Sequence, residues 1–260
     1  MTGAGEPVTV VAHGLGESIA QTRPLLSGVP GTKVFLQARG HGRPHEGDAG
    51  YQALADDLLA GAGGASQALG VSLGAGALLR LMSQHPTRFA RVVLYLPAAL
   101  DQTRQLAVRR GAGLSAALAA PDAAAVEAWV RAELPVDLSG ASVEAYVAAR
   151  TAYLLTCDLA PLLSALEHDV PVTSPDELAS VTADVLVVAQ EGDPVHPVSV
   201  AREVVAALPR ARLVAFARPG ALFRDRSRLR DVISAHLTGP SGSTPSDQPG
   251  DAGGVGRARE

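Results

Sequence analysis

The fold is decided by residues 65–84, which read ASQALGVSLGAGALLRLMSQ. Ala65–Leu69 is interpreted as a strand, although Ser66 and Gln67 make its apolar pattern weak, and Leu73–Gln84 repeats apolar residues at helical spacing. Between them, Gly70–Gly74 fits the pattern G-x-S-x-G with Ser72 at its centre. Glycines let the chain cross itself closely at a sharp strand-to-helix turn, and the start of the helix places positive potential beside the serine. The stretch therefore predicts a nucleophilic hydroxyl on a tight turn.

Short apolar runs alternate with helical patterns along most of the chain. Five further runs are interpreted as strands: Pro7–Ala12, Lys33–Ala38, Arg91–Leu96, Asp184–Gln190 and Arg212–Ala217. Helical patterns lie at Tyr51–Ala60, Pro197–Leu208 and Leu222–Leu237. Strands joined through helices form right-handed crossovers and pair in parallel. The predicted fold class is α/β, with a mainly parallel, doubly wound sheet covered on both faces.

The pattern changes after the fourth predicted strand. Three helical segments follow one another there without a clear strand between them: Gln102–Arg110, Asp122–Glu133 and Ser142–Leu155. We expect residues 101–182 to form a helical cap inserted into a core made of residues 1–100 and 183–238. Residues 239–260 are rich in Gly, Pro, Ser and Asp, and we expect them to be a disordered tail.

Composition argues against several functional classes. A net charge of −4 and an aromatic content of 3% do not suit a nucleic-acid binder. The apolar run Val92–Leu100 is far shorter than the about 20 residues of a membrane helix, and the first residues lack a signal-peptide pattern. Cys157 is the only cysteine and no two histidines share ligand spacing on one helix, so we expect neither a disulfide nor a metal site. The sequence favours a soluble cytoplasmic protein without membrane or nucleic-acid partners.

A second motif, HGLG at residues 13–16, directly follows the first predicted strand. A turn of this kind can direct a backbone N–H at a substrate oxygen. We expect the N–H groups of Leu15 and Leu73, with Gly14 beside them, to form an oxyanion hole. His13 and His41 belong to turn motifs, and backbone hydrogen bonding is the expected role of both.

The order of these motifs resembles the α/β-hydrolase superfamily over roughly residues 7–238. The motifs are HGLG at 13–16, RGHGRP at 39–44, GVSLG at 70–74, a helical insertion, and EGDP at 191–194. Within the superfamily the chain is most similar to small cap-bearing esterases and thioesterases. The resemblance implies Ser72 as nucleophile, Asp193 as triad acid, a small ester or thioester as substrate, and no cofactor.

The sequence departs from that pattern where the triad histidine is expected. The matching stretch, residues 217–222, reads ARPGAL and places Ala221 at the histidine position. If this alignment holds, Ala221→His should raise ester hydrolysis. His196 lies three residues after Asp193 on a loop expected to face the same crevice, and it is the best candidate for a substitute base. The predicted triad is therefore degenerate.

Two functions follow from these motifs. The first is a serine hydrolase or acyl-transfer enzyme in which Ser72 attacks a small ester or thioester. The second is a non-hydrolytic protein that keeps the fold and pocket, either as a ligand-binding or regulatory protein or as a cyclase or lyase that uses the oxyanion donors. Arg104, Arg109 and Arg110, at the start of the insertion, could bind an anionic substrate group or form a solvated helix face. The sequence leaves the oligomeric state open.

Overall fold

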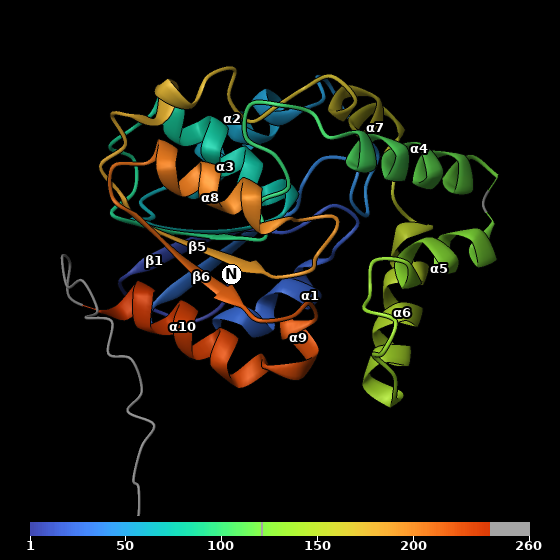
Figure 1. Cartoon of the computed structure of the whole chain (residues 1–260). Coiled ribbons are helices and arrows are strands. Elements are labelled where there is room, and N and C mark those ends of the chain that lie inside the picture. The colour runs from blue at the N-terminus through green and yellow to red at the C-terminus, as the bar shows by residue number, and fades with distance from the viewer. Residues whose placement is uncertain (121, 240–260) are drawn as a thin grey trace, which may run out of the picture.

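A computed structural model describes residues 1–120 and 122–239 (Figure 1). Its centre is a six-stranded sheet in the order β2-β1-β3-β4-β5-β6, and each pair of neighbouring strands is parallel. The strands are β1 (Val8–Ala12), β2 (Thr32–Leu36), β3 (Gln67–Val71), β4 (Arg91–Tyr95), β5 (Asp184–Gln190) and β6 (Ala211–Phe216). The predicted α/β class and parallel sheet are confirmed, and every strand boundary lies within two residues of its predicted place.

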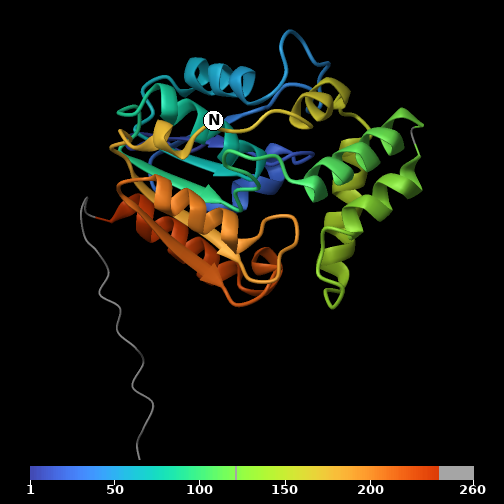
Figure 2. The same cartoon turned by 45° about the horizontal axis from the view of Figure 1, so that its top comes forward.

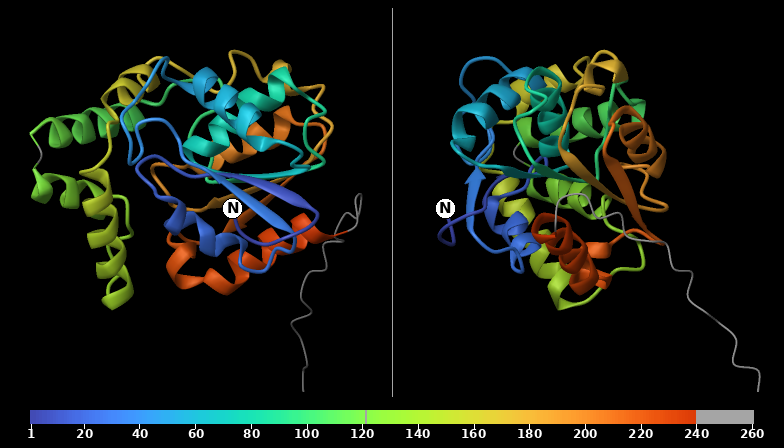
Figure 3. Two further views of the ribbon diagram at one scale, coloured as in Figure 1. Left: turned by 180° about the vertical axis from the view of Figure 1, so that it is seen from behind. Right: turned by 90° about the vertical axis from the view of Figure 1, so that its left-hand side faces the viewer.

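Helices cover both faces of the sheet, as Figures 1 and 3 show. One face carries the helices α2 (Tyr51–Ala62), α3 (Leu73–Gln84) and α8 (Val198–Ala207). The other face carries three one-turn helices and the last helix of the described chain: α1 (Ile19–Thr22), η1 (Arg23–Leu26), α9 (Ala221–Arg224) and α10 (Arg226–Thr238). The apolar side chains accordingly form two buried clusters, one on each side of the strands. This layering follows from β-strands whose residues are apolar on both faces.

The chain between β4 and β5 is helical. It contains α4 (Gln105–Ala119), α5 (Ala123–Arg131), α6 (Ala141–Leu154), α7 (Ala160–Leu166) and the short η2 (Pro175–Leu178). The described residues between 101 and 182 include no strand. Helices α4, α5 and α6 stand apart from the helices that cover the sheet (Figure 2). Helix α4 is longer than the segment predicted there, and α7 has no counterpart among the predicted helices.

The end of the described chain differs from expectation in one respect. The predicted single helix Leu222–Leu237 is interrupted at Asp225, which separates α9 from α10 with φ −127° and ψ 31°. Aspartate disfavours helix interiors because its side chain competes for nearby backbone groups, so a break at this residue has a local cause. The predicted tail lies outside the described residues from 240 onward. Among the described helices, none combines the length and apolarity needed to cross a bilayer.

Candidate active site

Ser72 occupies the turn between β3 and α3 with a positive φ of 47° and a ψ of −104°. Its N–H donates to the carbonyl of Tyr95 at 2.9 Å. The flanking glycines are required by space: a Cβ on Gly70 would lie 2.5 Å from the carbonyl oxygen of Gly74, and one on Gly74 would lie 2.5 Å from that of Ala12. A serine at positive φ is strained, and such strain is typical of functional turns.

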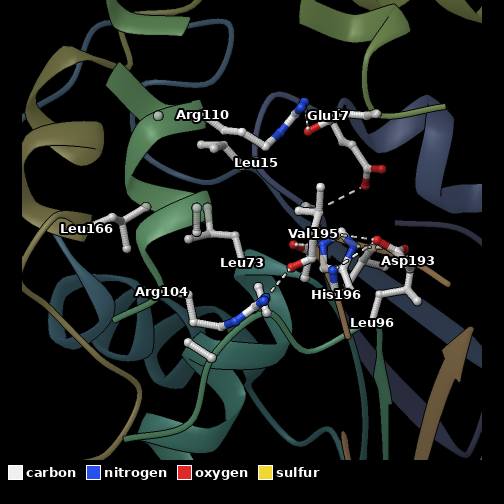
Figure 4. Close-up of a pocket in the computed structure, with 18 of the residues that line it drawn as sticks. Leu15, Glu17, Leu73, Leu96, Arg104, Arg110, Leu166, Asp193, Val195 and His196 are labelled. Atoms are coloured by element: carbon white, nitrogen blue, oxygen red, sulfur yellow. Dashed lines mark hydrogen bonds and ion pairs between the residues drawn. The ribbon is translucent and has the colours of Figure 1, made fainter. Parts of the chain in front are cut away.

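Three side chains form a continuous hydrogen-bonded chain at this turn. Figure 4 shows two of them, Asp193 and His196, side by side. The Oγ of Ser72 lies 2.9 Å from Nε2 of His196, and Nδ1 of His196 lies 3.2 Å from Oδ2 of Asp193. The second carboxylate oxygen, Oδ1, accepts from the N–H groups of Val195 and His196, each at 2.9 Å. The structure thus brings together all three residues that the sequence singled out.

The charge state of Asp193 follows from these contacts. Burial raises the pKa of Asp193, but the hydrogen bonds and electrostatic attraction of His196, together with the N–H of Val195, outweigh it. The net effect holds the pKa of Asp193 below its ordinary value. An ionised carboxylate facing Nδ1 keeps a proton on that nitrogen and leaves Nε2 free to accept one from Ser72.

The HGLG turn is fixed by its own hydrogen bonds. The N–H of Gly14 donates to Oε2 of Glu17 at 3.0 Å, and the N–H of Glu17 returns to the carbonyl of Gly14 at 3.1 Å. Within the described residues, the N–H of Leu15 has no acceptor. The N–H of Leu73 belongs to the first residue of α3, where an amide has no acceptor in its own helix. Leu15 and Leu73 both line the cavity above Ser72.

Two buried histidines support that turn from below. Nε2 of His41 accepts from the N–H of Gly16 at 2.9 Å, and Nε2 of His13 accepts from the N–H of Ala38 at 3.1 Å. Burial lowers the pKa of His13, while burial and the neighbouring His13 lower the pKa of His41 to about 3. Both rings are therefore neutral and bound to backbone groups.

Comparison with solved structures identifies the fold in which this site lies. An esterase from Exiguobacterium antarcticum superposes with a TM-score of 0.75 at 16% identity, over 91% of this chain and 93% of that chain. An enol-lactonase from Burkholderia xenovorans LB400 gives 0.74 at 19% identity, over 90% and 92%. A carboxylesterase from Bacillus subtilis gives 0.71 at 16% identity, over 92% and 86%. This chain has the α/β-hydrolase fold.

Sequence comparison is more local. The profile of the family described as TAP-like protein matches residues 145–245, a segment that contains Asp193 and His196 but not Ser72. No curated protein sequence matches the chain significantly. The resemblance to α/β-hydrolases that the motifs suggest is thus confirmed at the level of the fold.

Ala221, which the family pattern places at the position of the triad histidine, lies in the buried core. Its side chain is fully buried, at 0% exposure, in the cluster beneath the sheet, and it does not line the cavity. A histidine at this backbone position would have to fit among the buried side chains of that cluster, so burial argues against the predicted gain of hydrolysis in Ala221→His. The N–H of Ala221 instead donates to Oε1 of Gln190 at 2.7 Å, and Nε2 of Gln190 lies 3.4 Å from Oδ2 of Asp193.

A cavity of about 220 Å³ lies over Ser72 between the sheet edge and the inserted helices. Its far wall is mainly apolar and includes Ala107, Val108, Trp129, Leu134 and Tyr146. In the part of the chain that the structure describes, no group of three histidine, cysteine or acidic side chains is placed to hold a metal ion.

The arginines at the start of the insertion separate in space. Arg104 donates to the carbonyl of Val195 at 2.9 Å, whereas Nη2 of Arg110 lies 3.3 Å from Glu133. Arg109 is exposed and donates to Oε1 of Gln105, one turn earlier on the same helix, at 3.4 Å. The sequence gives no signal for Glu133, Arg150 or Gln190, because each has at least one partner on another element: Arg110 for Glu133, Leu15 for Arg150 and Ala221 for Gln190.

Proposed function

We propose that the protein is a serine hydrolase that cleaves a small ester or thioester through Ser72. The observation that carries this proposal is the 2.9 Å contact between Oγ of Ser72 and Nε2 of His196, continued to Asp193 at 3.2 Å. A hydroxyl becomes a nucleophile only when a base can take its proton, and this imidazole is within hydrogen-bond reach. A base in this position favours hydrolysis over the non-hydrolytic alternative, since a serine without such a base would be a poor nucleophile.

The reaction proceeds in two halves. Nε2 of His196 takes the proton of Ser72 as Oγ attacks the carbonyl carbon, and the N–H groups of Leu15 and Leu73 stabilise the oxyanion. The intermediate collapses, and His196 returns the proton to the departing alcohol or thiol. Water then attacks the acyl-serine with His196 again accepting a proton, which releases the carboxylic acid and restores Ser72.

The acid and the base of this triad come from one short turn. The two carboxylate oxygens of Asp193 have different partners. Oδ1 accepts from two N–H groups of its own turn, and Oδ2 faces Nδ1 of His196. The turn therefore fixes the carboxylate and the imidazole relative to each other before substrate binds. The triad is atypical because its histidine follows β5 instead of β6.

Residues 101–182 act as the cap in this proposal. Their side chains line the cavity opposite Ser72, where most of the wall is apolar and Arg110 and Arg150 are paired with Glu133. A mainly apolar wall whose charges are paired with one another suits an uncharged acyl group.

Labelling with a fluorophosphonate probe tests the proposal. We expect a covalent adduct on Ser72, located by mass spectrometry, and hydrolysis of p-nitrophenyl acetate and butyrate. Ser72→Ala should abolish both, whereas His85→Ala, at an exposed histidine, serves as the matched control. A folded wild-type protein that takes up no probe at high concentration would refute the proposal.

A further inference from the structure

Two arginines of the inserted segment bind backbone carbonyls beside the proposed catalytic groups. The first is Arg104, which immediately precedes α4 and donates from Nη1 to the carbonyl of Val195 at 2.9 Å (Figure 4). This carbonyl belongs to the Val195–His196 peptide, whose N–H donates to Asp193 at 2.9 Å. The peptide that leads into the imidazole is therefore bound at both ends.

The second arginine makes the same kind of contact on the opposite side of Ser72. Arg150, on α6, donates from Nη2 to the carbonyl of Leu15 at 3.0 Å. That carbonyl belongs to the Leu15–Gly16 peptide, whose N–H donates to Nε2 of His41 at 2.9 Å. The peptide next to the expected oxyanion donor is thus also bound at both ends, once by an inserted residue and once by a residue of the core.

Arg150 is itself held in place. Its side chain is 8% exposed, and its Nη1 lies 2.7 Å from Oε2 of Glu133 and 2.8 Å from the hydroxyl of Tyr146. Its guanidinium also lies over the ring of Trp129, 5.5 Å from the centroid. A buried guanidinium with a carboxylate partner and a fixed direction makes a charge-assisted hydrogen bond to a carbonyl, which is stronger and more directional than a neutral one.

We propose that Arg104 and Arg150 are positioning residues through which the inserted helices set the geometry of both halves of the site. Arg104 acts on the base through the Val195 carbonyl, and Arg150 acts on the oxyanion turn through the Leu15 carbonyl. This inference rests on the proposed function for its kinetic consequence, but the two bonds themselves do not depend on it. Because neither bond involves the substrate, their loss should reduce kcat more than it changes KM.

The kinetic test compares Arg104→Met and Arg150→Met with Arg109→Met, which changes an exposed arginine of α4. We expect kcat to fall about 10- to 100-fold for the first two variants with KM within about 2-fold, and the control to match wild type. Arg104→Lys and Arg150→Lys should recover part of the loss, because an ammonium can still donate to the carbonyl. Inhibition by a trifluoromethyl ketone, which forms an oxyanion on Ser72, should weaken in Arg150→Met by the same factor as kcat/KM.

Hydrogen exchange followed by mass spectrometry provides a measurement that needs no activity. Peptides covering residues 191–198 should exchange faster in Arg104→Met, and those covering 13–18 faster in Arg150→Met, with no change in Arg109→Met. If Arg150→Met fails to fold, Arg150→Lys and Arg104→Met still decide the matter. Unchanged kcat or unchanged exchange in a folded variant overturns the inference while hydrolysis by the wild type stands. A wild type without labelling at Ser72 instead refutes the proposed function, and exchange alone then decides whether the arginines hold the two turns.

Discussion

The loops that follow β5 and β6 begin side by side, since Gln190 pairs with Phe216 and the N–H of Glu191 donates to the carbonyl of Phe216 at 2.8 Å. The two loops nevertheless carry different polar side chains. The loop after β5, residues 191–197, carries both Asp193 and His196. The loop after β6, residues 217–220, carries no titratable group near Ser72, although the family pattern places the base immediately after it.

The two loops also differ in how they are built. Pro194 and Pro197 restrict the backbone of the first loop, and Asp193 ties its own turn through two backbone N–H groups. The second loop ends at Gly220, which has a φ of 90° and lies so close to the inserted segment that a Cβ there would be 3.0 Å from the Leu138 side chain. One loop thus positions polar groups, and the other lets the inserted chain approach. A general base must lie within hydrogen-bond distance of the serine hydroxyl. Either of two adjacent loops at the same edge of the sheet can carry a histidine that meets this requirement.

Moving the histidine from one loop to the other is the sharpest test of this comparison. We expect His196→Ala to lower kcat about 10³- to 10⁴-fold, the loss typical of removing a triad base. The double variant His196→Ala/Ala221→His should remain as inactive, because position 221 faces the core beneath the sheet. Ester hydrolysis and thermal unfolding should be measured together for both variants. Recovery of activity in a folded double variant would show that the β6 loop can still present a base.

The sequence predicts the sheet well because strands buried on both faces appear as apolar runs, as in β5, whose boundaries agree with the prediction. The strand before Ser72 has a weak apolar pattern because it contains Gln67. This side chain is 5% exposed and is satisfied by the Thr9 hydroxyl at 3.0 Å and the Leu237 carbonyl at 2.6 Å. A buried polar residue interrupts the apolar run by which a strand is predicted. The partners that allow its burial lie far away in the sequence, so a local pattern does not show them.

The site also has features that the sequence predicts and features that it does not. Ser72, Asp193 and His196 could be named because a turn motif, a loop motif and a spacing of three residues are local features. The distance between Ser72 and His196 could not be predicted, since it depends on how β3 and β5 lie in the folded sheet. The contact of Arg150 with Leu15 joins residues that are 135 positions apart, and no short motif records it.

A smaller effect is expected at the link between the two loops, which Gln190 provides. Its amide accepts from the N–H of Ala221 and donates toward Asp193, so Gln190→Leu leaves one buried N–H without a partner and one carboxylate oxygen with fewer donors. We expect the free energy of unfolding to fall by about 1–3 kcal/mol and kcat to fall about 3- to 10-fold. Gln52→Leu, at an exposed glutamine of α2, is the control for urea unfolding and kinetics. Wild-type stability in Gln190→Leu would mean that the loops are not coupled through this amide.

The smallest expected effect concerns the pH dependence of stability. The pKa of Asp193 lies below its ordinary value of 3.8, so the folded protein binds fewer protons there than the unfolded chain. The resulting stabilisation is fully present above pH 3.8 and is lost as the pH falls through the folded-state pKa. The difference in unfolding free energy between wild type and Asp193→Asn should therefore shrink below about pH 4.

Urea unfolding at several pH values between about 6 and 3 measures this difference. His41, whose pKa burial lowers to about 3, titrates in both proteins and cancels in the comparison. Asp231→Asn, at an exposed carboxylate of α10, gives the baseline for removing one negative charge. A difference that grows on acidification would mean that burial of Asp193 outweighs its hydrogen bonds, in which case the turn after β5 would not hold an ionised acid beside its imidazole.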